Sequence, residues 1–135
     1  MVHYQIIVVD DDDEDQLIMQ EYFEGIHADG RVKYLQNGQQ VLDYLEAVTD
    51  DSLLPNLIIL DLNMPLLNGT NTLLHIKRNN RFKNITVIIL STSENENEKR
   101  KCLSFGAHEY LVKPFTYEEG ANMVRKFAVY LGKSQ

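Results

Sequence analysis

The chain has 135 residues, of which 44% are hydrophobic and 24% charged, so it is not a disordered polypeptide and its length suits one folded domain. The formal net charge of −7 argues against nucleic-acid binding, the single Cys102 excludes an internal disulfide, and no apolar stretch approaches the roughly 20 residues that span a bilayer. We therefore expect a cytoplasmic domain over residues 1–135, without nucleic-acid or membrane partners.

The first half of the chain predicts two strands, each followed by a helix. Residues Ile6–Val9 form a continuous apolar run that is too short for a helix and typical of a strand buried on both faces. A weaker strand candidate is Val32–Leu35. Apolar residues three or four positions apart predict the two helices, at Ile18, Tyr22 and Ile26 and then at Val41, Leu42, Leu45 and Val48. Residues 48–56 contain Asp, Ser and Pro and predict a long loop.

The second half repeats this alternation of strand and helix. Strands are predicted at Leu57–Leu60, at residues 87–90 and, more weakly, at Glu109–Val112. The third predicted helix begins near Thr70, and the fourth spans residues 96–105 and ends at a glycine. The last helix has apolar residues at alternating steps of four and three, at Tyr117, Ala121, Val124, Ala128 and Leu131.

The order of strand and helix, repeated five times, predicts an α/β fold. Strands separated by helices favour a parallel sheet with right-handed crossovers and helices on both faces, here a (βα)5 doubly wound five-stranded sheet. In an open sheet of this kind, ligands bind at the carboxyl ends of the strands. The residues directly after each predicted strand are therefore the candidates for function.

Acidic, hydroxyl and amine side chains occupy these positions. Asp10 and Asp11 follow the first predicted strand, Asp61 the third, Ser91 the fourth and Lys113 the fifth. Several carboxylates at one sheet edge repel one another unless they share a cation, and Mg²⁺ suits a site made of a few carboxylates, water and phosphate. A carboxylate beside a metal and an ammonium is also a nucleophile for in-line phosphoryl transfer.

Motifs at these strand ends resemble the receiver domains of two-component response regulators. The motifs are Val9-Asp10-Asp11, Leu60-Asp61-Leu62-Asn63-Met64-Pro65 with Gly69, Leu90-Ser91-Thr92, Gly106-Ala107 and Lys113-Pro114-Phe115. The resemblance covers nearly the whole chain and implies a single receiver domain with a flavodoxin-like sheet of strand order 2-1-3-4-5. The long loop before the third strand, with residues 61–65 and 91–94, loosely resembles stand-alone receivers that include partners of bacterial phytochromes.

The resemblance implies a phosphoacceptor and a set of metal ligands. Asp61 is the expected phosphoacceptor, and it would share a Mg²⁺ ion with three neighbouring residues. Asp11 would bind Mg²⁺ directly, Asp10 would act through a water molecule, and Asn63 would contribute its backbone carbonyl.

The resemblance also implies the groups that respond to phosphorylation. Ser91 and Lys113 are expected to bind phosphoryl oxygens, and the bond between Lys113 and Pro114 is expected to be cis, as is typical in this family. Tyr110 matches the aromatic switch position, which repacks when Ser91 shifts.

The implied function is two-component signalling. A sensor histidine kinase or a phosphotransfer protein would phosphorylate Asp61, and apart from self-catalysed phosphorylation and dephosphorylation no enzyme activity is expected. The added charge would alter a surface formed by the fourth helix, the fifth strand and the fifth helix. A downstream protein target would bind this surface, and a homodimer through it is a further expectation, to which Tyr117 or Tyr130 would contribute.

Alternative functions predict different residues at the strand ends. An aspartyl-phosphate phosphohydrolase requires a second acid two positions after Asp61, where this chain has Asn63. A flavodoxin-like binding module requires a hydroxyl- and glycine-rich loop after the first strand, where this chain has acids. A receiver scaffold that binds partners without phosphorylation is the third alternative. Helix capping would by itself account for Ser91 and for the acidic run, with Asp15 as its cap.

Overall fold

The computed structural model describes residues 2–64 and 66–132, and these residues form one five-stranded parallel sheet. The strands are β1 (Ile6–Val9), β2 (Val32–Leu35), β3 (Leu57–Leu60), β4 (Thr86–Ser91) and β5 (Glu109–Val112). Their order is β2-β1-β3-β4-β5, which confirms the predicted fold class and strand order. β4 extends one residue beyond the predicted apolar run at each end, and the other strands have the predicted bounds.

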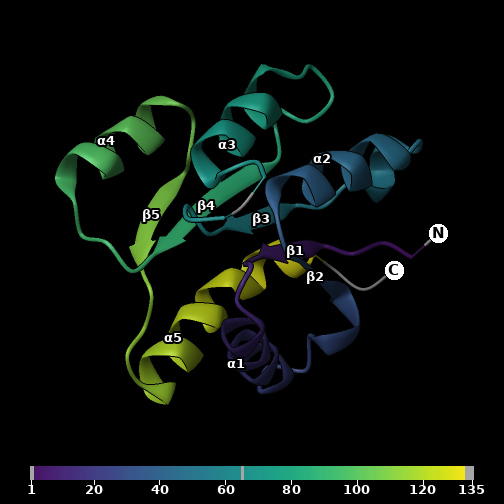
Figure 1. The fold of residues 1–135 in the computed structure, drawn as a ribbon. Coiled ribbons are helices and arrows are strands. Elements are labelled where there is room, and N and C mark those ends of the chain that lie inside the picture. Colours follow the sequence, from purple (N-terminus) through teal and green to yellow (C-terminus); the bar gives the residue numbers. More distant parts are fainter. Residues whose placement is uncertain (1, 65, 133–135) are drawn as a thin grey trace.

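Helices cover both faces of the sheet. They are α1 (Asp13–Glu24), α2 (Gly38–Ala47), α3 (Gly69–Arg78), α4 (Glu96–Ser104) and α5 (Tyr117–Phe127). Figure 1 shows α1 and α5 on one face and α2, α3 and α4 on the other. Short 3₁₀ helices include Asp51–Leu53 in the predicted long loop and Ala128–Leu131, which continues α5 to the last apolar position of the predicted helix. Within the described ranges, the helices are too short or too polar to cross a membrane.

The sheet separates two hydrophobic cores because successive side chains of a strand point to opposite faces. Ile7 and Val9 pack with the α2–α4 side, whereas Ile6 and Val8 pack with α1 and α5. Every residue of β1 and β3 is buried, which explains why these strands are continuous apolar runs. Cys102 of α4 is also fully buried and fills the core as a small apolar side chain.

The first turn of α1 differs from the prediction. The cap is Asp12, whose carboxylate accepts the backbone N–H groups of Glu14 (2.8 Å) and Asp15 (3.1 Å). The prediction that Asp15 caps the helix is therefore wrong, because Asp15 already lies inside the helix and its side chain contacts Lys113. Likewise α4 is capped by Asn95 and not by Ser91.

Candidate functional site

The sheet fixes the backbone of the candidate site residues. The backbone N–H of Asp10 donates to the Leu35 carbonyl oxygen, and that of Asp61 to the Val9 carbonyl oxygen, each at 3.0 Å. The backbone N–H of Lys113, directly after β5, donates to the carbonyl oxygen of Ser91, the last residue of β4, at 2.8 Å. These bonds extend the strand ladders by one residue, so the side chains leave the same edge of the sheet from well-defined positions.

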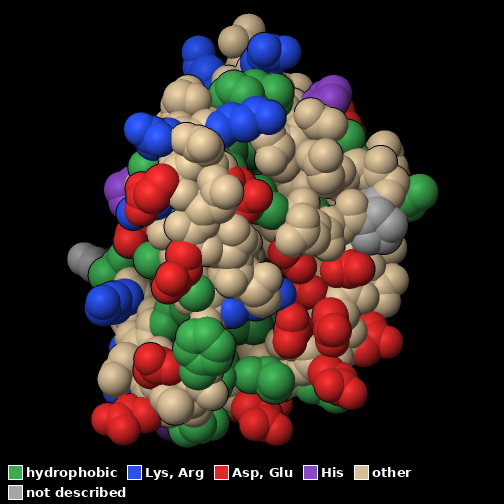
Figure 2. Space-filling model, turned by 60° about the vertical axis from the view of Figure 1, so that its left-hand side comes forward, with side chains coloured by type: hydrophobic (Ala, Val, Ile, Leu, Met, Phe, Trp, Pro, Cys, Tyr) green, Lys and Arg blue, Asp and Glu red, His purple; other side chains and the backbone are tan. Residues whose placement is uncertain are grey.

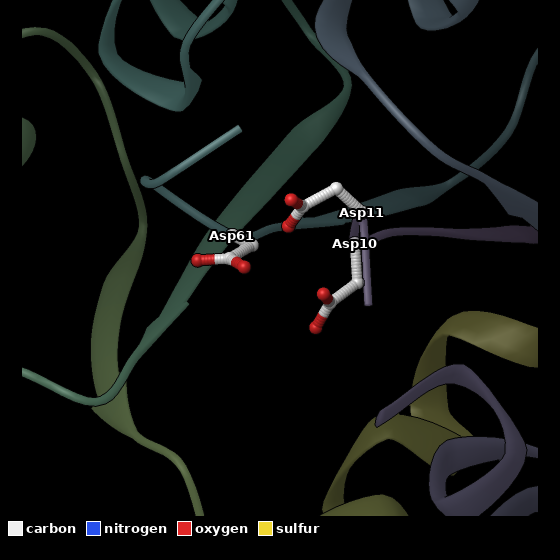
Figure 3. Close-up of side chains that lie close together, drawn as sticks. All are labelled: Asp10, Asp11 and Asp61. Carbon is white, nitrogen blue, oxygen red and sulfur yellow. The ribbon is translucent and has the colours of Figure 1, made fainter. Parts of the chain in front are cut away.

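A cluster of carboxylates forms at this edge. The side chains of Asp10, Asp11 and Asp61 each offer an oxygen atom within 4.8 Å of the others. In Figure 3, Asp10 and Asp11 extend from the end of β1 to the side on which Asp61 lies. Asp10 and Asp61 are buried, with 4% and 8% of their surface exposed, whereas Asp11 is exposed. Carboxylate oxygens at this spacing, open to water on one side, fit Mg²⁺.

Backbone amides orient the two buried carboxylates. The N–H of Asp12 donates to Asp10 Oδ1 (2.9 Å), and the N–H of Asn63 donates to Asp61 Oδ1 (3.2 Å). Burial raises the pKa of Asp10 to about 6, because desolvation outweighs the stabilising bonds from the Asp12 amide and Lys113. The charged form of Asp10 is therefore costly, and a bound cation would offset that cost.

Lys113 places an ammonium beside the carboxylates. Its Nζ lies 2.8 Å from Asp15 Oδ2, 3.0 Å from Asp10 Oδ2 and 3.4 Å from Asp61 Oδ2. Burial acts to lower the pKa of Lys113, but hydrogen bonds to Asp15 and Asp10 outweigh burial and hold this pKa above its usual range. Lys113 is therefore protonated at neutral pH and can bind an anionic oxygen.

Ser91 lies at the end of β4, next to the strand that carries Asp61. The β3–β4 register pairs Leu60 with Ile89, so the ends of these two strands are neighbours. The Ser91 side chain is fully buried, and its Oγ accepts the backbone N–H of Ser93 at 3.1 Å. This bond fixes the start of the connection that leads to α4.

Tyr110 links β5 to the segment between β4 and α4. Its side chain is buried, and its hydroxyl oxygen lies 2.9 Å from the Ser93 carbonyl oxygen and 2.7 Å from Glu98 Oε1 of α4. Burial, which is the largest influence, raises the pKa of Tyr110. Tyr110 therefore points inward, and Glu98 is a partner that the sequence did not indicate.

The expected cis bond before Pro114 is a wrong prediction. Among the described residues no peptide bond is cis, and both Lys113 and Pro114 are described. A peptide bond before proline favours trans by roughly 0.5–1 kcal/mol. With the trans bond the Lys113 ammonium already reaches Asp10 and Asp61. Pro65, part of the motif that contains Asp61, lies outside the described residues.

Two further residues of this site were not identified from the sequence. The first is Asp15, whose carboxylate contacts Lys113. The second is Gln16, whose side-chain Nε2 donates to the carbonyl oxygens of Asp10 and Leu35, both at 2.8 Å. Both residues lie in the first turn of α1, where side chains tilt toward the N-terminus of the helix and hence toward the end of β1. That tilt is the signal that would have indicated them.

Comparison with known proteins defines the class of this protein. The family model described as the response regulator receiver domain matches residues 6–125. The chain therefore belongs to this family, whose members are the phosphoryl-accepting domains of two-component signalling.

Individual relatives show which members of the family this chain is similar to. Response regulator Rcp1 of Synechocystis sp. is 31% identical over 122 residues, which cover 89% of this chain and 83% of Rcp1. The crystal structure of Mn²⁺-bound Rcp1 has a TM-score of 0.79 and 29% identity, and covers 96% of each chain. The phosphorylated cyanobacterial phytochrome response regulator RcpA has a TM-score of 0.83 and 26% identity, over 99% of this chain and 98% of RcpA. The resemblance to phytochrome-partner response regulators is confirmed.

Proposed function

We propose that Asp61 accepts a phosphoryl group with the help of a bound Mg²⁺ ion. The observation that carries this proposal is the convergence of Asp61 with the carboxylates of Asp10 and Asp11 and with the Lys113 ammonium. Asp11 would bind Mg²⁺ directly, Asp10 would act through a water molecule, and Asn63 would contribute its backbone carbonyl. The Mn²⁺-bound form of the relative Rcp1 supports a divalent ion in this chain.

In the proposed reaction, a carboxylate oxygen of Asp61 attacks the phosphorus atom of the donor. A new P–O bond forms while the bond to the leaving group breaks, and the electron pair of that bond stays on the leaving group. A bound Mg²⁺ ion would supply neutralisation of the phosphoryl charge. The Lys113 ammonium and the Ser91 hydroxyl would each bind a phosphoryl oxygen. Beyond this transfer and the hydrolysis of the product, we propose no enzyme activity.

The proposed donor is a phosphohistidine on a sensor histidine kinase or a phosphotransfer protein, so the leaving group is an imidazole nitrogen. A hollow of about 280 Å³ beside Lys113 and Asp15 has Ile18, Phe115 and Tyr117 on its walls. Phe115 is 89% exposed, and such an apolar rim beside Lys113, which contacts the proposed acceptor, supports a protein donor. In the view of Figure 2, acidic side chains gather at the lower right of the molecule, with hydrophobic side chains beside them.

We also propose how the signal leaves the domain. Phosphorylation would draw the Ser91 hydroxyl and the Lys113 ammonium toward the phosphoryl group, and Tyr110 would change its packing against α4, where it contacts Glu98. This change would alter the surface of α4, β5 and α5, which a downstream protein would bind.

The surface of α4, β5 and α5 has features that suit pairing with a second copy. A groove of about 560 Å³ between β5 and α5 carries acidic Glu109 and basic Lys126. A two-fold pairing brings one surface against its own copy, so opposite charges on that surface can match. We propose that the phosphorylated chain forms this homodimer.

The proposed phosphorylation is tested by intact mass after incubation with phosphoramidate and Mg²⁺. We expect the wild-type chain to gain one phosphoryl group, and we expect this gain to vanish with EDTA and in Asp61→Asn. Asp29→Asn, which removes an exposed acid far from the site in sequence, is the matched control and should behave as wild type. Steady hydrolysis of the donor at enzymatic rates, far above the slow turnover that self-catalysed dephosphorylation of Asp61 allows, would favour the phosphohydrolase alternative. No mass gain and no binding of beryllofluoride would favour the phosphorylation-independent scaffold.

A further inference from the structure

The shortest contact of the Lys113 ammonium is with a carboxylate outside the acidic cluster. Lys113 Nζ lies 2.8 Å from Asp15 Oδ2, closer than to Asp10 Oδ2 at 3.0 Å or Asp61 Oδ2 at 3.4 Å. The Lys113 side chain is 17% exposed and that of Asp15 38%. Because Lys113 is largely shielded from water, this pair is screened less than an ion pair on the open surface.

The three carboxylates match the donors of the ammonium. A lysine ammonium has three N–H groups, and Asp15, Asp10 and Asp61 can each accept one. The two short contacts come from the side of β1 and α1, and the longest is directed at the proposed acceptor. An oxygen of the new phosphoryl group would form next to this third N–H group.

The turn that carries Asp15 is itself held in place. Asp12 caps α1, and the Gln16 side chain bonds the carbonyl oxygens of Asp10 and Leu35. The neighbouring residue Glu14 lies in the same turn but is exposed. Asp15 therefore offers a fixed anchor to a lysine side chain that reaches it from β5.

We propose that Asp15 is a positioning residue for phosphoryl transfer, which anchors the Lys113 ammonium so that one N–H group stays directed at Asp61. The inference rests on the proposed function of Asp61. Asp15 acts through Lys113 and contacts neither the metal nor the phosphoryl group. Without this anchor the Lys113 ammonium keeps its contact with Asp10 but is less firmly directed at the acceptor, which slows transfer.

The first test compares phosphorylation rates from phosphoramidate at saturating Mg²⁺. Asp15→Ala should slow the reaction about 10-fold, since small displacements of a catalytic group have effects of this order or more. Asp15→Glu, which keeps the carboxylate, should recover most of the rate. Glu14→Gln, which removes a charge from the same turn without touching Lys113, should stay within about twofold of wild type. A wild-type rate in Asp15→Ala, or an equal loss in Glu14→Gln, would overturn the inference.

A double-mutant cycle tests whether Asp15 acts through Lys113. In a Lys113→Ala chain, adding Asp15→Ala should cause no further loss of rate, because the group to be positioned is gone. An equal loss in both backgrounds would overturn the inference. If Lys113→Ala reacts too slowly to time, the same cycle is measured on beryllofluoride affinity, and circular dichroism verifies that each variant is folded.

The wild-type chain separates the two claims. If it gains no phosphate, the proposed function fails and the role of Asp15 fails with it. If it is phosphorylated and Asp15→Ala reacts equally fast, only the positioning role of Asp15 is refuted.

Discussion

At the scale of single residues, burial and charge compete most directly at Asp10. Its surface is 4% exposed, and burial raises its pKa to about 6 from the 3.8 of an exposed aspartate. The folded state therefore binds the Asp10 proton more tightly than the unfolded state does. As the pH rises from about 4 to about 6, this residue makes the fold less stable, and the loss persists at neutral pH.

We expect Asp10→Asn to stabilise the fold when divalent ions are removed. In EDTA at about pH 7.5, the free energy of unfolding should rise by up to about 3 kcal/mol, because the amide carries no charge to desolvate. This gain in unfolding free energy should shrink as the pH falls toward about 4. In saturating Mg²⁺ the variant should instead be less stable than wild type, since Asp10 favours the bound ion. Urea denaturation measures each value, with Asp29→Asn as the control. A variant less stable than wild type in EDTA at neutral pH would contradict this assignment.

The sequence was sufficient to predict some residues of the site and not others. Asp10, Asp61 and Lys113 were predicted because each directly follows a strand, and parallel strands end at one edge. The partnership of Asp15 with Lys113 was missed because the two residues are 98 positions apart and only the folded helix brings them together. Helix capping was attributed to Asp15 because spacing alone does not distinguish the residue before the helix from those in its first turn.

At the scale of elements, a close approach of α3 to the β3–α3 connection shapes the site. The N–H of Gly69 donates to the Leu62 carbonyl oxygen at 3.0 Å. A Cβ atom at Gly69 would lie against the carbonyl oxygen of Asp61 and 2.7 Å from Leu62 Cα. Only glycine fits here without displacing the backbone that carries the proposed acceptor.

We therefore expect Gly69→Ala to destabilise the fold by about 1–3 kcal/mol, because backbone atoms have to move to accommodate the methyl group. Phosphorylation of Asp61 should also slow. Gly30→Ala is the matched control, because a Cβ atom there has no neighbour within 4 Å, and its stability should change by less than about 0.5 kcal/mol. Urea denaturation and intact mass measure the two effects. Equal stabilities of the two variants would show that the contact at Gly69 is unimportant.

The bounds of the elements were predictable to different degrees for a physical reason. β1 and β3 are buried on both faces, so each has to be a continuous apolar run with polar residues at its ends. The end of β4 was placed one residue early because Ser91 is polar although it still pairs with β5. Apolar periodicity continued through residue 131, but it did not distinguish α5 from the 3₁₀ helix that follows.

At the scale of the whole molecule, the sheet connects the proposed acceptor to the proposed partner surface of α4, β5 and α5. Tyr110 bridges β5 and α4 through Glu98, and Lys113 follows β5 directly. A change at Lys113 or Ser91 is therefore expected to reach the surface of α4, β5 and α5. The strand order and the layers were predictable, whereas the Tyr110–Glu98 contact depends on side-chain directions that the sequence pattern does not give.

We expect beryllofluoride with Mg²⁺ to shift the chain from monomer toward dimer. Lys126→Glu should weaken the dimer without changing the phosphorylation rate, because Lys126 is an exposed residue of α5 on the proposed surface. Lys83→Glu, an exposed charge reversal before β4, is the control. Sedimentation equilibrium measures the association. A dimer that is insensitive to Lys126→Glu, or no association at all, would contradict pairing through this surface.

The central claim is that Asp61 carries the phosphoryl group, and reductive trapping tests it most directly. Borohydride reduces an aspartyl phosphate to homoserine, which peptide mass spectrometry locates in the sequence. After incubation with phosphoramidate and Mg²⁺, we predict homoserine at position 61 and none when Mg²⁺ is omitted. Homoserine at position 10, 11 or 15, or phosphate that resists borohydride on a serine or histidine, would contradict the account.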